Sequence, residues 1–278
     1  MKFMNKVGKS LLLIVVCVLV FGISEVRAFT LGDLDVYSLA ESFTWREFDD
    51  AGGQLMKESG PRYGVGAAFT REFSNHLTLK PRIELIDGSV DYDGQMRTKA
   101  GVPVTTTTEY LGIKLEFDLA ARIRQSQSFV LEPFAGIGIR TWFRDIQDGT
   151  AANGTPAIGY TEDWTTIYGR LGFRGERSFE QKNSTFLLVG VKLPVYTENY
   201  ISDIYVSSSA MTLRPGNKPS LFAEAGVRLD RFKISAFYDS MRFKKSPIVS
   251  VNSSGTLKDF YQPRSESDMT GLKIGATF

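Results

Sequence analysis

The last ten residues, Met269-Thr270-Gly271-Leu272-Lys273-Ile274-Gly275-Ala276-Thr277-Phe278, alternate in polarity along their whole length. Because successive side chains of a β-strand point to opposite faces, Leu272, Ile274 and Phe278 would share one apolar face. Lys273 and the two glycines would share the other face. The stretch therefore predicts a strand that has very different surroundings on its two sides and that ends on an aromatic residue.

The same alternation recurs through the chain, whereas helical periodicity is nearly absent. In total the pattern predicts ten antiparallel strands, at about 34–48, 61–74, 76–92, 106–124, 128–144, 161–180, 184–197, 219–230, 231–245 and 267–278. The first strand is the least clear, because Glu41 shares a face with Tyr37, Leu39, Phe43 and Trp45. Arrangements of eight or twelve strands therefore stay open as alternatives.

The predicted connections fall into two classes. Four are tight turns, at 74–76, 125–127, 180–183 and 230–231, and five are longer, at about 49–60, 93–105, 145–160, 198–218 and 246–266. Strict alternation of short and long connections, with an even number of strands, is typical of an all-β, up-and-down transmembrane barrel. A soluble β-sandwich is the alternative, but it explains neither the alternating lengths nor the terminal Phe278.

Aromatic residues gather near the predicted strand ends, which favours two girdles at the borders of a membrane. One predicted girdle contains Trp45, Phe48, Tyr63, Tyr92, Tyr110, Trp142, Phe143, Tyr160, Trp164, Tyr196, Tyr200 and Phe243. The other contains Phe73, Phe129, Phe179, Phe186, Phe232 and Phe278.

Residues 1–28 have the organisation of a signal peptide. Lys2, Lys6 and Lys9 precede an apolar run at 11–22, and Val26-Arg27-Ala28 places small residues at positions −3 and −1 of a cleavage site. The alternative is an uncleaved anchor. Removal of this segment takes away four cations, one anion and the chain's one cysteine, and it changes the net charge from +2 to −1. The mature chain, 29–278, would then have no disulfide and no basic field for nucleic acid.

Together these features resemble the superfamily of small Gram-negative outer-membrane β-barrel proteins. The stretch Leu131-Glu132-Pro133-Phe134-Ala135-Gly136-Ile137-Gly138 is also similar to a Pro-aromatic-x-Gly-x-Gly strand of many small barrels. The resemblance implies location in the bacterial outer membrane, contact with its lipid and lipopolysaccharide, and a monomer without a periplasmic peptidoglycan-binding domain. It also implies that Phe278, Ile274 and Leu272 form part of the signal that the barrel-assembly machinery reads.

On this register, the inward face carries charges of both signs. The predicted lumen charge network comprises Lys80, Arg82, Glu84, Lys114, Glu116, Asp118, Glu132, Arg140, Arg170, Arg174, Lys192, Glu224, Arg228 and Lys273. Because buried charges must be paired, we expect a lumen filled by ion pairs and a structural or surface-facing role. The alternative is a narrow, passive, porin-like channel for small polar or anionic solutes. Binding of a partner protein through the loops is a third possibility, weakened by their modest lengths.

No enzymatic constellation emerges from the sequence, and we predict no catalytic residue and no cofactor. The outer-membrane proteases, phospholipases and lipid A-modifying barrels rely, as families, on a histidine near the outer rim. The one histidine, His76, falls in a predicted periplasmic turn. Asp87, Asp91 and Asp93 could together hold calcium, but their spacing lacks the remaining oxygen ligands of a calcium loop. The prediction is therefore no metal, with these three carboxylates as the weak candidate.

Overall fold

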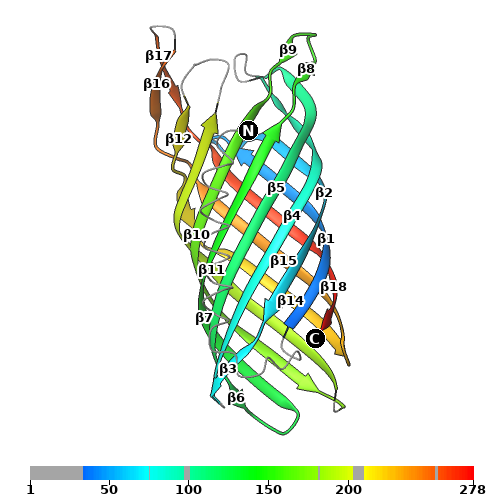
Figure 1. Cartoon of the computed structure of the whole chain (residues 1–278). Helices are drawn as coiled ribbons and strands as arrows, with labels where there is room; N and C mark the ends of the chain where they lie inside the picture. Colours follow the sequence, from blue (N-terminus) through cyan, green and yellow to red (C-terminus); the bar gives the residue numbers. More distant parts are fainter. Residues whose placement is uncertain (1–33, 75, 97–100, 181, 203–209, 254–255) are drawn as a thin grey trace, which may run out of the picture. The chain divides into compact units, whose positions relative to one another are not determined.

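The computed structural model describes residues 34–278 except 75, 97–100, 181, 203–209 and 254–255. Within this part of the chain, ten long strands close into an antiparallel barrel (Figure 1). They are β1 (Leu34–Phe48), β2 (Gln54–Phe69), β4 (Leu77–Gln95), β5 (Pro103–Ala121), β7 (Phe129–Ile146), β10 (Tyr160–Ser178), β11 (Asn183–Ser202), β14 (Ser220–Leu229), β15 (Phe232–Lys244) and β18 (Arg264–Thr277). Each pairs with its neighbours in chain order, which confirms the prediction of an up-and-down barrel with ten strands. The predicted signal peptide lies outside the described residues.

The barrel closes where the first and last long strands meet. β1 and β18 stay in register from Asp35, opposite Thr277, to Phe48, opposite Arg264. At the end of this seam, Phe278 N–H donates to the Leu34 carbonyl over 2.8 Å, and Leu34 N–H donates to the Phe278 carbonyl over 3.3 Å. The closed ring leaves neither strand with an unpaired edge, which is the condition for a sheet that contacts lipid.

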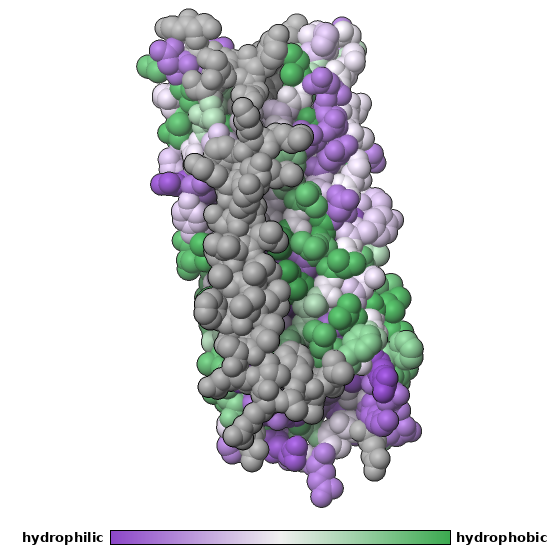
Figure 2. Space-filling model, in the orientation of Figure 1, coloured by the Kyte–Doolittle hydropathy of each residue, from purple (hydrophilic) through white to green (hydrophobic). Residues whose placement is uncertain are grey.

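The outer surface carries an apolar band. Outward side chains such as Leu85, Leu111 and Ile137 are exposed, and Figure 2 shows such hydrophobic residues gathered over the middle and lower part of the visible face, with polar residues above and below. In β18, Ile274 is 59% exposed and Lys273 only 6%. The terminal strand therefore turns its apolar face outward and its lysine into the barrel.

The strands continue beyond this band at one end, which we call the loop end because connections 147–159 and 245–263 lie there. The opposite end, with the turn 230–231 and the C-terminus, is the turn end (Figure 1).

β2 begins at Gln54, so the predicted loop 49–60 is wrong and the connection is the five-residue turn 49–53. Gly52 supplies the positive φ of 90° that this turn requires. The sequence concealed these strand ends because both of their faces carry polar residues.

Short strands extend the two ends of the barrel. β3 (Arg71–Ser74) and β6 (Ile123–Arg124) lie at the turn end. At the loop end are β8 (Gly149–Ala151), β9 (Pro156–Ala157), β12 (Met211–Leu213), β13 (Gly216–Lys218), β16 (Val249–Ser253) and β17 (Thr256–Phe260), of which β16 and β17 form a separate hairpin (Figure 1). In the part of the chain that the structure describes, no helix is long and apolar enough to cross a membrane.

Candidate functional site

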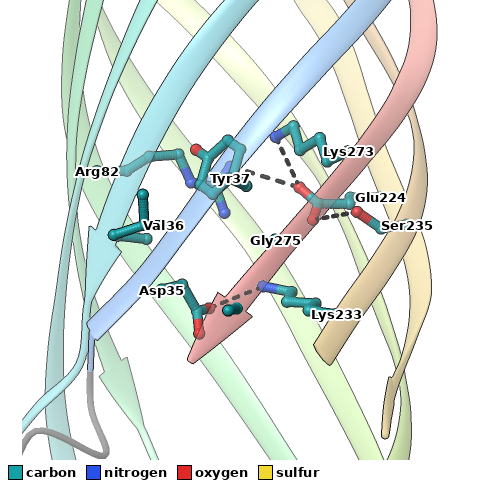
Figure 3. A pocket seen from close by; sticks show the side chains of 11 residues that line it. Asp35, Val36, Tyr37, Arg82, Glu224, Lys233, Ser235, Lys273 and Gly275 are labelled. Atoms are coloured by element: carbon teal, nitrogen blue, oxygen red, sulfur yellow. Dashed lines mark hydrogen bonds and ion pairs between the residues drawn. The ribbon is translucent and has the colours of Figure 1, made fainter. Parts of the chain in front are cut away.

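The interior of the barrel is the candidate site, and its middle is a layer of interlinked ion pairs. Lys273 Nζ lies 2.9 Å from Glu84 Oε1 and 3.0 Å from Glu224 Oε2. Lys114 Nζ lies 2.5 Å from the other oxygen of Glu84, and Arg82 reaches Glu224 over 3.6 Å. Figure 3 shows Lys273 and Ser235 directed toward the same Glu224 carboxylate. These strands thus bring each of these five charges to an opposite charge.

The layer continues across the lumen with a second group of pairs. Arg170 pairs with Glu116, and its Nε lies 3.1 Å from Asp118 Oδ1. Lys192 pairs with Asp239, which Lys114 also approaches over 3.7 Å. Because these groups are nearly shielded from water, each one depends on its partner for compensation of its charge.

At the turn end of the interior, the charged side chains are more exposed to solvent. Asp35 and Lys233 pair over 3.0 Å there, below the middle layer in Figure 3. Lys80 pairs with Glu132, and Arg228 lies 4.0 Å from Glu176. Arg174 packs its guanidinium 5.3 Å from the centre of the Phe186 ring. Arg228 and Glu176 are each about one-third exposed, so this end of the lumen resembles a charged vestibule.

Toward the loop end, an aromatic layer replaces the charges. The chain's three tryptophans, Trp45, Trp142 and Trp164, are all buried inside the barrel and contact one another, with ring centres 5.1–6.3 Å apart. Phe243 lies 5.5 Å from the Trp164 ring, and Tyr110 belongs to the same cluster. These rings come from β1, β5, β7, β10 and β15, so the layer reaches from one side of the lumen to the other.

This layer corrects the predicted aromatic girdle at the loop end. Trp45, Tyr110, Trp142, Trp164 and Phe243 face the interior, whereas Tyr63, Phe143 and Tyr196 are exposed on the outside. Phe186, assigned to the other girdle, is also buried within the barrel. The prediction assigned rings to the girdle because they lie near strand ends. Whether a ring faces inward or outward depends instead on the alternation of side chains along the strand.

Beyond the aromatic layer lies a buried cluster centred on Arg144. Its guanidinium lies 2.7 Å from Glu58 and 2.8 Å from Glu162, and Glu47 approaches to 3.7 Å. Trp164 Nε1–H donates to Glu162 over 2.8 Å, and Trp45 Nε1–H donates to Glu47 over 3.0 Å. The polar edges of the tryptophans therefore face this cluster while their rings pack in the layer below.

The structure places all fourteen predicted network residues on the inner side of the wall, the least buried of them at the turn end. Arg140 differs from the rest of the buried middle, because its nearest polar partner is the Met269 sulfur at 3.0 Å. The prediction missed the Arg62–Glu41 pair and the two main partners of Arg144. Their inward parity was readable, but Glu58 and Glu162 lie on stretches of strand whose outward neighbours are polar, so no apolar face reveals the register there.

The remaining candidates do not converge on a site. Among the described residues, no group of three or more potential ligands is placed to hold a metal ion. Asp87, Asp91 and Asp93, the weak metal candidate, all lie on the outer face of β4. His76 is exposed beside β4 at the turn end, far along the strand from the loop-end connections.

Solved structures with the same architecture are bacterial outer-membrane proteins. The outer membrane protease OmpT of Escherichia coli superposes with a TM-score of 0.59 and 12% identity, over 91% of this chain and 99% of that one. An outer membrane channel of Pseudomonas putida F1 gives a TM-score of 0.41 and 10% identity, over 92% and 98% of the two chains. No family model matches the sequence, and no curated protein has significant sequence similarity to it. The first superposition establishes the fold and leaves the chemistry open.

Proposed function

We propose that the chain is a closed, non-enzymatic outer-membrane β-barrel that serves a structural or surface-facing role. The observation that carries the proposal is the layer of Trp45, Trp142 and Trp164 across the lumen. It would act as a monomer in outer-membrane lipid and lipopolysaccharide, after insertion by the barrel-assembly machinery.

The remaining space in the lumen supports a closed state. Four cavities between the interior side chains measure about 10–20 Å³, roughly the space of one water molecule each. A hydrated ion that crossed the barrel would have to separate the tryptophan rings and the ion pairs of the middle layer. Both kinds of contact are buried, so their separation would be costly.

The surface-facing part of the proposal rests on the strand extensions at the loop end. Beyond the apolar band, the outer faces of β4 and β5 carry exposed Asp91, Asp93 and Glu109. Such carboxylates are unsuited to hydrocarbon, so this part of the wall would stand in water outside the membrane. The barrel would then present a rigid, polar surface to the exterior.

The absence of enzymatic activity is also a proposal. The similarity to the protease OmpT is one of fold only, since the two sequences are 12% identical. The one histidine, His76, is exposed at the turn end, where the loop-end side chains cannot reach it. A general base at the outer rim would therefore have to be some other residue type.

Conductance across planar bilayers tests the closed state against the alternative of a narrow, anion-favouring channel. We expect no stable steps from the wild-type protein at high salt. A Trp142→Gly, Trp164→Gly double variant should introduce steps, whereas Tyr63→Gly, which removes an exposed outer ring, should not. Stable, salt-dependent steps from correctly folded wild-type protein would refute the closed barrel and favour the channel.

A further inference from the structure

Arg140 is a buried cation in the middle of the barrel that has no carboxylate partner among the residues that the structure describes. It extends from β7, is 7% exposed, and donates from NH1 to the Met269 sulfur over 3.0 Å. Its guanidinium lies 5.7 Å from the centre of a Trp142 ring. Among the described residues, no carboxylate oxygen pairs with it within 4.0 Å. A thioether and an aromatic face are weak substitutes for a counter-ion.

The groups around Arg140 do not supply the missing charge. Lys114 stands directly opposite it on β5. Asp239, a carboxylate of the same layer, already pairs with Lys192 and is approached by Lys114 over 3.7 Å. On the other side, Arg62 has its own partner, Glu41, at 2.5 Å and 2.9 Å. The neighbourhood is therefore short of negative charge.

Two small cavities adjoin this guanidinium. Arg62, Arg140 and Trp142 line both of them, Tyr110 also lines the first, and Trp45 also lines the second. Each measures about 10 Å³, which is enough for one water-sized particle. The Arg62 guanidinium is held in place by Glu41 and by the Phe43 ring, 3.6 Å away. The site is thus preformed and lined by two guanidinium groups.

We propose that one monovalent anion of about the size of chloride binds between Arg62 and Arg140 inside the barrel. An uncompensated charge in low dielectric is strongly disfavoured, and a water molecule in the cavity would bring no charge to offset it. The small volume excludes oxyanions such as sulfate. The inference does not depend on whether the lumen conducts.

Diffraction from crystals grown in sodium bromide tests the proposal, because bromide replaces chloride and scatters anomalously. We expect one anomalous peak within hydrogen-bonding distance of both guanidinium groups. The peak should vanish in Arg140→Met, which keeps the length of the side chain and removes its charge. It should persist in Arg228→Met, which removes an inward arginine at the wetter turn end.

A measurement in solution keeps the test independent of crystals. At constant ionic strength, replacement of sodium gluconate by sodium bromide should raise the unfolding midpoint of wild-type protein in a saturable way, and should not do so for Arg140→Met. If Arg140→Met fails to fold, the wild-type peak and titration decide the matter. No peak between the two arginines, a peak that survives in Arg140→Met, or equal wild-type midpoints in the two salts would overturn the proposal.

Discussion

Removal of the Arg144 guanidinium should be among the most destabilising single changes in the barrel. The side chain is 1% exposed, and its partners Glu58 and Glu162 are 0% and 3% exposed. The variant Arg144→Met retains most of the packing volume but leaves both carboxylates buried without a cation. We therefore expect a large loss in the free energy of unfolding, caused by charge and not by a cavity.

The magnitude follows from the burial of the pair. Loss of one partner of a buried ion pair typically costs about 3–5 kcal/mol, since the remaining charge is uncompensated. At about 1.4 kcal/mol for each factor of ten, the equilibrium constant of unfolding would rise roughly 140- to 3,700-fold. The Tyr110 and Thr108 hydroxyls also donate to Glu58, so the lower half of this range is the expected value.

Equilibrium unfolding by urea in phospholipid vesicles, followed by tryptophan fluorescence, measures the change. Arg214→Met is the matched control, because Arg214 and Glu198 form a pair at 3.5 Å with exposures of 69% and 30%. This exposed pair should contribute at most about 1 kcal/mol. Adding Glu58→Gln to Arg144→Met should recover part of the loss, since one uncompensated charge is then gone. If Arg144→Met and the Arg214→Met control have the same free energy of unfolding within error, Glu58 and Glu162 do not depend on the Arg144 guanidinium for charge compensation.

Three further outcomes are expected. Gly190→Val should destabilise the barrel in the same urea assay, because a Cβ there would lie 2.4 Å from the Phe222 ring; unchanged stability would refute this close packing. Phe278→Ala should slow insertion by purified barrel-assembly machinery while spontaneous refolding into detergent continues; equal insertion rates would remove Phe278 from the assembly signal. At the loop end, the hydrogen bond that Lys245 donates to Asp50 raises the pKa of Lys245. The stabilisation by this hydrogen bond is therefore present at neutral pH and is lost as the pH rises through the raised pKa. An NMR titration should detect the raised pKa and its return to the ordinary value in Asp50→Asn.

Strand parity was readable from the sequence wherever one face of a strand meets lipid. Leu272, Ile274 and Phe278 had to lie on one side of the terminal strand, so Lys273 had to lie on the other. The same argument located ten strands and the inward charges, because hydrocarbon tolerates few polar groups and imposes a period of two. Where the strands leave the apolar band, as at 54–60, that constraint ends and the boundaries were missed.

Parity does not give the level of a residue along the axis of the closed barrel. That level determines which inward side chains meet. Trp45, Trp142 and Trp164 come from three strands, and their stacking depends on the tilt and stagger of the closed barrel. The same geometry brings Lys273 to Glu84 across 189 residues of sequence and leaves Arg140 with no carboxylate partner among the described residues. Local alternation thus specifies the wall and its two faces, whereas contacts across the lumen arise only after the wall has closed.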